Sequence, residues 1–478
     1  MAHYPSPLIT KIRKRRTPDQ RTFHGDLRFL KLTVGKVPLG VSDPAGISKT
    51  VSEGADMKTL FITHRFPHPP NRGDSIRSFH FLERFAEMGS VHLATLYEQE
   101  PAEDSHRVLN ELCAGVLAFP WGKRRRWIRA GVSLLCGKTM TEGLFGDRKL
   151  KAALRHLVST EKFDRIVVFC SSMVQYLDML RGTVNEQTPV VTDLVDVDSQ
   201  KWFDYAARAR GWKKCVFQME GERLRKLEIG IGKCCAGILA VTPEETALYR
   251  SFAAGKIPEE VWIRDIPNGV DTQYFNAEAP ELADVAEIPE RLVFVGALDY
   301  RANADGVEWF VKNVLPEVRK RFPACEFDVV GSRPGPGLKQ LAETTPGMNL
   351  IGTVPDVRPY LKRAAAAVIP LQVARGLQNK VLEACSMSRP VIASEGAAEG
   401  IHCRTSEDLL VCGTPENWIG KLSELFENAE LRSRLSENGR RMVETSYGWS
   451  VQLEKLETFL CEVSDCERNS SGSENELS

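Results

Sequence analysis

Residues 368–401 read V-I-P-L-Q-V-A-R-G-L-Q-N-K-V-L-E-A-C-S-M-S-R-P-V-I-A-S-E-G-A-A-E-G-I. An apolar run over residues 365–371 predicts a buried strand, which ends at a loop over residues 372–379. A helix is expected from about Lys380, because apolar residues recur where they can face a core, and an arginine–proline pair ends it. A second buried strand follows at residues 391–394. The stretch therefore predicts a strand–loop–helix–strand unit.

The loop of this unit suits a phosphate group. It contains Arg375 and Gly376 and leads into the N-terminus of the helix, so that the glycine-containing backbone and the helix dipole meet at one point. Glu383 lies three residues into the helix, where a carboxylate is placed to reach the diol of a ribose. Together these residues predict the nucleotide-sugar pocket of a glycosyltransferase.

The length and charge of the chain exclude several classes of protein. At 478 residues the chain is too long for one ordinary core, so two domains are expected. A formal net charge of zero argues against a general nucleic-acid binder. No window approaches the roughly 18–20 apolar residues that a membrane span needs, and no secretory signal is visible. A cytoplasmic protein is expected, either free or peripheral on the inner face of the membrane.

The cysteines point the same way. Twelve are scattered along the chain without a Cys-x-x-Cys pair, and several lie inside apolar runs. Reduced, buried thiols explain this pattern better than disulfides or a zinc site.

The two ends of the chain read unlike its middle. Residues 1–56 carry a basic cluster between Lys11 and Arg16 and no lasting apolar period. They predict a disordered extension or a misassigned upstream start, and the alternative is a basic arm for anionic lipid. Residues 464–478 are polar and are also expected to be disordered.

The first clear unit is a strand at residues 58–63, a helix at residues 75–88 and a strand at residues 91–97. Prolines keep the loop between the first two out of a helix, and a glycine allows a tight turn. This β-loop-α-β opening predicts a parallel sheet with the loop at the edge where ligands bind. The loop residues expected to face a cleft, rather than to form an ordinary turn, are Asn71, Arg72, Gly73 and Asp74.

Three acids, Asp193, Asp196 and Asp198, fall at the C-terminal end of a buried strand at residues 190–194. Acids in this place suit catalytic or acceptor-side carboxylates, whereas a magnesium site would also need phosphates nearby. The alternative is that Asp198 and Ser199 only cap the next helix.

Residues 123–129, K-R-R-R-W-I-R, form a second basic cluster around one tryptophan. They predict either a solvated helix face or contact with a membrane surface or an anionic lipid-linked acceptor. Nothing in the sequence separates these two interpretations.

The second half of the chain repeats the α/β rhythm. It follows residues 276–290, which are acidic, rich in proline and alanine and without a period, and which are expected to link two domains. Glycines at the ends of four predicted strands let backbone N–H groups approach a ligand closely. These are Gly296, Gly331, Gly352 and Gly376.

We therefore expect two Rossmann-like, doubly wound α/β domains facing across a cleft. The expected segments are a basic extension at 1–56, an acceptor-side domain at 57–275, a linker at 276–290, a nucleotide-sugar-binding domain at 291–445, a C-terminal helix at 446–463 and a tail at 464–478.

Several motifs resemble those of glycosyltransferase family 4, whose members have the GT-B architecture. P-N-G-V-D-x-x-Y-F at residues 267–275 resembles the segment that joins the halves of these enzymes. F-V-G-A-L-D-Y-R-A-N-A-D-G at residues 294–306 resembles their first C-domain strand and loop, and residues 368–401 resemble their donor loop and E-x7-E region. H-R-F-P-H-P-P-N-R-G-D-S-I-R and D-V-D-S-Q-K-W narrow the resemblance to the sugar transferases of PEP-CTERM/exosortase exopolysaccharide loci.

The resemblance implies retaining transfer of a sugar from a nucleotide diphosphate sugar to a glycan or lipid-linked acceptor. It implies no bound metal and no cofactor, because basic residues and helix N-termini neutralise the diphosphate. The donor-binding residues that it implies are Gly73, Arg301, Arg333, Gly352, Val354, Gly376, Leu377, Gln378, Asn379, Lys380 and Glu383. The catalytic candidates are Asp193, Asp196 and Arg375, the last of which stands where the family has the first glutamate of E-x7-E.

Two other functions stay open. A GT-B nucleotide-sugar epimerase would need acid and base side chains in the cleft, and histidines are scarce there. A sugar-nucleotide-binding protein without catalysis is suggested by the arginine at position 375.

Overall fold

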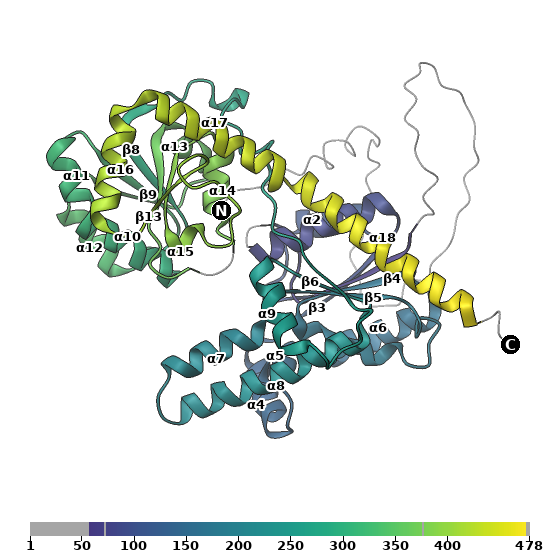
Figure 1. Ribbon diagram of the computed structural model, residues 1–478. Coiled ribbons are helices and arrows are strands. Elements are labelled where there is room, and N and C mark those ends of the chain that lie inside the picture. The colour runs from purple at the N-terminus through teal and green to yellow at the C-terminus, as the bar shows by residue number, and fades with distance from the viewer. Residues whose placement is uncertain (1–56, 71–72, 375–376, 475–478) are drawn as a thin grey trace, which may run out of the picture. The chain divides into compact units, whose positions relative to one another are not determined.

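The computed structural model describes residues 57–70, 73–374 and 377–474, with the backbone alone for residues 123–125, 208 and 465–474 (Figure 1). Its strands gather into two parallel sheets, each with helices on both faces. The prediction of two doubly wound α/β domains is thereby confirmed. The extension at 1–56 and the site candidates Asn71, Arg72, Arg375 and Gly376 lie outside the described residues.

The first sheet has seven strands in the order β3-β2-β1-β4-β5-β6-β7, and each strand is parallel to its neighbours. Its central strands are unbroken apolar or threonine-containing runs, because both faces of a parallel sheet are covered; every residue of β1 is buried. The strands are β1 (Thr59–Thr63), β2 (Val91–Tyr97), β3 (Gly115–Pro120), β4 (Arg165–Phe169), β5 (Val190–Val195), β6 (Gly237–Ala240) and β7 (Trp262–Asp265).

Three helices of the first domain begin at residues whose side chains cap them. Thr139, Asp147 and Thr242 accept hydrogen bonds from the first turns of α5, α6 and α9. The helices are α2 (Gly73–Met88), α3 (Glu103–Leu112), α4 (Lys123–Leu135), α5 (Met140–Phe145), α6 (Arg148–Thr160), the 3-10 helix η1 (Ser171–Leu180), α7 (Asp198–Arg208), α8 (Trp212–Cys234) and α9 (Pro243–Ala253).

The second sheet has six parallel strands in the order β10-β9-β8-β11-β12-β13. The strands are β8 (Ile288–Val295), β9 (Glu326–Val330), β10 (Met348–Gly352), β11 (Ala364–Ile369), β12 (Val391–Ser394) and β13 (Leu410–Cys412). Its helices are η2 (Pro280–Leu282), α10 (Arg301–Asn313), α11 (Leu315–Arg321), α12 (Pro336–Thr344), α13 (Arg358–Arg363), α14 (Asn379–Ser386), α15 (Glu395–Ala398), α16 (Pro415–Glu427) and α17 (Ala429–Ser446).

Each sheet has one point at which the order of its strands reverses. In the first sheet this switch point lies between β1 and β4, and in the second it lies between β8 and β11. Sheets of this kind bind ligands outside the carboxyl ends of their strands at the switch point. The loops after these four strands are therefore where a site is expected.

The chain enters the second domain earlier than predicted. Val270, Phe275 and Leu282 are buried in the core of the second domain, and Val270 pairs with Gly448 just before the last helix. Residues 276–290 therefore do not form the predicted linker, because their apolar side chains pack on the second core.

The last helix is longer than predicted and packs on the first domain. This helix, α18 (Trp449–Glu474), runs past the predicted end at residue 463. Its Phe459 fills the space beside Gly237 of β6, where a Cβ would lie 2.8 Å from the ring. Glu457 and Glu462 form ion pairs with arginines of α2 and β7. Within the described ranges no helix, α18 included, combines the length and apolar character that a bilayer crossing demands.

Candidate functional site

Three of the four predicted glycines lie together at the carboxyl edge of the second sheet. Gly331 donates its N–H to the carbonyl oxygen of Gly352 at 2.8 Å, and Gly296 donates to that of Val330 at 2.9 Å. A Cβ on Gly331 would overlap the carbonyl oxygen of Gly296, and Gly352 has a φ of +81° that favours glycine. The strand ends can therefore close on one another only because these residues are glycines. The fourth glycine, Gly376, lies outside the described residues.

The loop after β11 is fixed against the neighbouring elements before it reaches α14. Ser394, at the end of β12, donates its hydroxyl to the carbonyl of Leu371 at 2.6 Å. Gly306 of α10 lies so close to Pro370 that a Cβ there would stand 2.8 Å from its carbonyl oxygen. The residue before α14, Gln378, provides no side-chain cap. The first N–H groups of α14 are thus left for another acceptor.

Lys380 and Glu383 lie one turn apart on α14 and are both half-buried. Burial lowers the pKa of Lys380 to about 8, although the charge of Glu383 opposes this. Burial likewise raises the pKa of Glu383 to about 7, although Lys380 opposes it. Lys380 donates to Gln378 at 3.1 Å, and among the described residues neither group has an ion-pair partner. A buried cation and carboxylate of this kind can bind an anion and a hydroxyl group respectively.

The two predicted arginines of the second domain reach solvent. Arg301 opens α10, pairs with Asp305 at 3.2 Å and is 92% exposed. Arg333 follows β9, pairs with Asp299 at 2.8 Å and is 67% exposed. Arg333 has a left-handed backbone with a φ of +55°, which is uncommon for a residue with a side chain. Both guanidinium groups stand at the ligand-binding edge, but neither is held in one place by burial.

The other predicted donor residues lie at the same edge of the second sheet, except for one that belongs to the first domain. Leu377 and Val354 are half-buried and pack on the second core, and Asn379, the first residue of α14, has a buried side-chain oxygen without a partner among the described residues. Gly73 instead opens α2 in the first domain, where a Cβ would meet open space.

The first domain has a polar cavity of about 300 Å³ at its own switch point. His64, directly after β1, contacts Asp74 at 3.2 Å and stacks on Phe169 with 5.9 Å between ring centroids. The Nδ1 of His64 is buried and has no partner in the part of the chain that the structure describes. Burial raises the pKa of Asp74, but the hydrogen bond and charge of His64, with the charge of Arg65, lower it to about 2. Asp74 therefore holds the imidazole ring in place as an anion.

Two further carboxylates line this cavity. Lys201 pairs with Asp196 at 2.8 Å and with Asp198 at 3.4 Å, and Ser171 donates to Asp198 at 2.7 Å. Burial lowers the pKa of Lys201, but the charges of Asp198 and Asp196 raise it above its ordinary value. The cavity thus presents two carboxylates that share one lysine and can accept hydrogen bonds from hydroxyl groups. Asp198 is the first residue of α7, whose N-cap is Val197 and has no side-chain capping hydrogen bond, so the alternative that Asp198 only caps the helix does not hold.

The backbone is strained where it meets this cavity. Cys170, after β4, has a φ of +74°, and Val195, at the end of β5, has a φ of +66°. Both residues line the cavity. A non-glycine residue in this region costs on the order of 1–3 kcal/mol, and such strain gathers at functional sites.

Asp193 lies apart from the cavity, although the sequence predicts it as catalytic. It is fully buried and accepts a hydrogen bond from Arg77 of α2 at 2.6 Å. Arg77 in turn donates to the carbonyl of Ile266 at 2.6 Å and to the side chain of Asn268 at 3.3 Å. Asp193 therefore anchors the segment that leaves the first domain, and Asp196, directly after β5, is the acid that lines the cavity.

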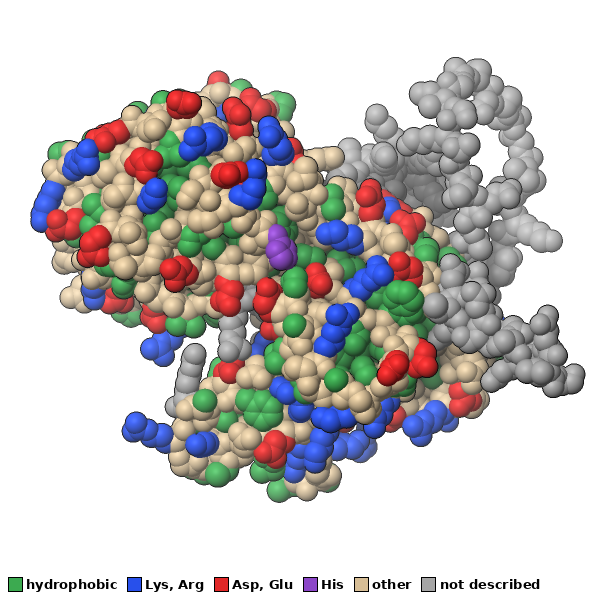
Figure 2. Space-filling view, viewed as in Figure 1, with side chains coloured by type: hydrophobic (Ala, Val, Ile, Leu, Met, Phe, Trp, Pro, Cys, Tyr) green, Lys and Arg blue, Asp and Glu red, His purple; other side chains and the backbone are tan. Residues whose placement is uncertain are grey.

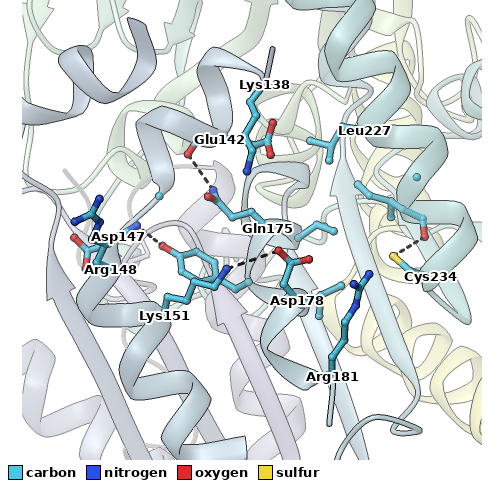
Figure 3. A pocket seen from close by; sticks show the side chains of 16 residues that line it. Lys138, Glu142, Asp147, Arg148, Lys151, Gln175, Asp178, Arg181, Leu227 and Cys234 are labelled. Carbon is cyan, nitrogen blue, oxygen red and sulfur yellow. Dashed lines mark hydrogen bonds and ion pairs between the residues drawn. The ribbon is translucent and has the colours of Figure 1, made fainter. Parts of the chain in front are cut away.

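A larger cavity of about 590 Å³ lies between η1, α8 and the junction of α5 and α6 (Figure 3). None of the predicted site residues lines it. Some of its polar groups pair with one another: Lys151 faces Asp178 at 3.7 Å, and Gln175 donates to the carbonyl of Glu142 at 3.2 Å (Figure 3). Size alone therefore does not make it the candidate site.

Sequence reasoning missed His64 and Lys201. The signal for His64 was its position directly after the first strand, and the signal for Lys201 was a cation three residues after Asp198. No group of three or more His, Cys, Asp or Glu side chains suited to a metal ion occurs among the described residues.

Comparison with known families concerns the second domain. Residues 289–428 match the family model described as glycosyl transferases group 1. A curated relative, glycosyltransferase 1 domain-containing protein 1 of Xenopus tropicalis, is 23% identical over 120 residues, which are 25% of this chain and 34% of the relative. The chain thus spans about a third of the length of that relative. Residues 289–428 of the second domain are thus similar to a glycosyltransferase group 1 domain.

Comparison with solved structures covers both domains. Sucrose-phosphate synthase from Thermosynechococcus elongatus matches with a TM-score of 0.62 and 15% identity, over 86% of this chain and all of that one. Anabaena HepE in complex with UDP and glucose matches with a TM-score of 0.57 and 11% identity, over 85% of this chain and all of that one. A glycosyltransferase from Rickettsia africae gives a TM-score of 0.57 at 12% identity, over 85% of this chain and 99% of that one. The fold is GT-B, as predicted.

Proposed function

We propose that the chain is a retaining glycosyltransferase that moves a sugar from a nucleotide diphosphate sugar to a glycan or lipid-linked acceptor. The observation that carries the proposal is the half-buried pair of Lys380 and Glu383, which lies in the region similar to a glycosyltransferase group 1 domain, beside an uncapped helix N-terminus. A partly buried lysine with a lowered pKa and a partly buried carboxylate with a raised pKa suit a ligand that carries both phosphate and hydroxyl groups.

The donor occupies the carboxyl edge of the second sheet in this proposal. Lys380 and the first N–H groups of α14 bind the diphosphate, and Glu383 accepts hydrogen bonds from the ribose. The exposed side chains of Arg301 and Arg333 add positive charge that attracts the diphosphate. The segment from Gly352 to Val354 lies beside the base. HepE was solved with UDP and with UDP-glucose, so a uridine diphosphate sugar is the first donor to test.

The acceptor hydroxyl oxygen forms a bond to the anomeric carbon of the sugar as the bond from that carbon to the diphosphate oxygen breaks. Negative charge develops on the leaving phosphate oxygen, which takes up the hydroxyl proton. Lys380 and the helix dipole of α14 stabilise that charge where it forms, which is the largest catalytic contribution expected of the protein. Because these groups stabilise the charge, the proposed reaction uses no bound metal. Arg375 remains the proposed catalytic partner in the donor loop, with the acceptor hydroxyl supplied from the cavity beside Asp196.

The acceptor side is proposed at the cavity that His64 and Asp196 line. Asp196 and Asp198 share Lys201, and Asp74 contacts His64, so the cavity suits hydroxyl groups rather than an anionic group. The resemblance to PEP-CTERM/exosortase transferases supports a role in exopolysaccharide biosynthesis on the cytoplasmic side of the membrane. Membership of glycosyltransferase family 4 is part of the same proposal.

Thermal-shift screening with UDP, GDP and their sugars, followed by a donor-hydrolysis assay, tests the function. We expect a nucleotide to raise the melting temperature by mass action and its sugar to be hydrolysed slowly without an acceptor. Tight binding of a donor with no turnover of any donor would instead identify a sugar-nucleotide-binding protein, the alternative that the arginine at position 375 suggests.

A further inference from the structure

Helix α4 presents an apolar face to solvent. Trp127, Ile128, Val132 and Leu135 are 61%, 69%, 53% and 88% exposed. Their spacing places them on one side of the helix. They are four of the ten large hydrophobic side chains that stand exposed among the described residues. Isolated exposed apolar residues need no explanation, but four on one helix face mark an interaction surface.

The opposite side of α4 is fixed to the first domain. Ala130 is buried, and Gly143 of α5 lies against it, where a Cβ would stand 2.7 Å from its Cα. Ser133 donates to the carbonyl of Thr139 at 2.7 Å, and Arg223 of α8 donates to that of Leu134 at 2.6 Å. The exposed face is therefore not the result of a detached or frayed helix.

The start of α4 carries an unusual excess of positive charge. Its first four residues are Lys123, Arg124, Arg125 and Arg126, and no acid lies in the first turn. The residue before the helix, Gly122, provides no side-chain cap. Arg126 pairs with Glu98 at 3.4 Å. Cations at the positive end of a helix dipole are unfavourable, so a turn that begins with three more of them gains from an external anion. Over the lower part of the first domain, where Figure 1 shows α4 and α8, Lys and Arg side chains gather (Figure 2).

The neighbouring helix pair repeats the pattern. Trp212 at the start of α8 is 73% exposed and is followed by Lys213 and Lys214, and Tyr205 of α7 is 54% exposed. Tryptophan and tyrosine with flanking lysine are typical of side chains at a membrane–water interface. The hydrogen bond from Arg223 ties the middle of α8 to α4, and Trp212 begins the same helix.

We propose that α4 and the start of α8 form a docking surface for an anionic phospholipid bilayer. The apolar face of α4 inserts into the bilayer, and its basic first turn contacts the anionic headgroups. Apolar side chains beside clustered cations suit such a bilayer, because burial of apolar area and attraction to anionic lipid both contribute to binding at the membrane interface. A symmetric contact with a second copy of the chain would place the same basic turns together, and their repulsion opposes it.

The surface is connected to the proposed acceptor site, and this step rests on the proposed function. Helix α5 packs on α4 through Gly143, and its Thr141 and Phe145 line the cavity that contains His64. The bilayer therefore lies one helix away from the cavity. A hydroxylated acceptor anchored in the membrane by a lipid would reach the cavity from this side.

Vesicle flotation with the full-length protein tests the proposal. We expect binding to vesicles of phosphatidylcholine with 30% phosphatidylglycerol and little binding to phosphatidylcholine alone, at a ratio on the order of 10-fold or more. Arg124→Glu with Arg125→Glu should lower the partition coefficient at least about 25-fold, at roughly 5-fold for each basic residue. Trp127→Ser with Leu135→Ser should lower it on the order of 10-fold.

Matched variants elsewhere control for charge, apolar surface and folding. Val184 is 57% exposed in the same domain, and Lys339 is exposed on α12 of the second domain. Val184→Ser and Lys339→Glu should bind as the wild type does. Because the basic cluster between Lys11 and Arg16 also attracts anionic lipid, the α4 variants in the full chain decide the question, and unchanged binding in both would overturn the proposal.

Measurements of nucleotide binding and donor turnover distinguish this proposal from the proposed function. Each α4 variant should bind UDP in solution as the wild type does, so lost vesicle binding with intact nucleotide binding supports the surface. If the protein turns over no donor but still binds vesicles, the proposed glycosyltransferase function is wrong and the proposed docking surface stands. A wild-type dimer in light scattering that the Trp127→Ser and Leu135→Ser pair dissociates would show that a second copy occupies the face, and would overturn the proposal.

Discussion

The two sheets share one topology but differ at their switch points. The second sheet meets its ligand edge with glycines and with Lys380 and Glu383, which have no ion-pair partner among the described residues. The first sheet meets its edge with charged side chains that pair with one another, such as Lys201 and Asp196. The difference fits the proposed division of labour, in which the second edge binds the anionic donor. The first edge is complete and suits a neutral, hydroxylated group.

The largest effect is expected where an acid of the first sheet is structural rather than functional. Asp193→Ala leaves the buried guanidinium of Arg77 without its partner and should destabilise the fold by about 3–5 kcal/mol. The measurement is the free energy of unfolding in urea. Asp305→Ala, which removes the exposed partner of Arg301, is the control and should cost less than about 1 kcal/mol. A stable Asp193→Ala protein that has lost only transfer would restore Asp193 as a catalytic residue.

Substitutions in the first-domain cavity should separate the acceptor from the donor. His64→Asn and Asp196→Asn each remove a group that holds a hydroxylated acceptor, and should lower kcat/KM for the acceptor by roughly 10- to 100-fold. The affinity for UDP should not change. Asp178→Asn, in the larger cavity, is the matched control. Equal loss of nucleotide binding in the His64 or Asp196 variants would contradict the division of labour between the two edges.

Substitutions of the α14 pair should do the reverse. Lys380→Met and Glu383→Gln should each weaken UDP binding by about 10-fold or more, because each removes a charge-assisted hydrogen bond. The protonated lysine is the form that binds phosphate, so wild-type affinity should fall as the pH rises through about 8, the pKa of Lys380. Calorimetry from pH 6.5 to 9.5 checks this expectation. Lys380→Met should lose the pH dependence, whereas Lys339→Met should keep it.

The smallest effect is expected from the exposed arginines. Arg301 and Arg333 are 92% and 67% exposed, and water screens their charges. Arg301→Ala and Arg333→Ala should therefore weaken UDP binding only about 2- to 3-fold each. The same titrations provide the measurement. A loss as large as that of Lys380→Met would show that these side chains close over the ligand and become buried.

Much of the second domain could be predicted from the sequence, because local patterns determine it. The apolar runs, the glycines after them and the proline that ends α14 act within a few residues of one another. Lys380, Glu383 and three of the four glycines accordingly lie at the edge where they were expected. The linker was placed wrongly because an acidic, proline-rich stretch gives no sign that Ala277, Ala279 and Leu282 pack on a distant core.

The first domain's site could not be predicted in the same way. Asp193 and Asp196 look alike in the sequence, yet Asp193 meets Arg77, which lies 116 residues earlier in the chain, and Asp196 meets the cavity. The exposed face of α4 was equally hidden. Its spacing is that of an ordinary packed helix, and only the positions of α5 and α8 leave that face without a partner.

The two parallel α/β domains and the proposed donor edge could be predicted from the sequence, because strand runs, glycine turns and helix starts are set by residues close together in the chain. Tertiary structure decided which acid is structural, which histidine meets the cavity and which helix face stays in solvent. Those outcomes depend on partners from distant segments, and the side chain of an acid or a tryptophan is the same whether its partner is an arginine, a ligand or water.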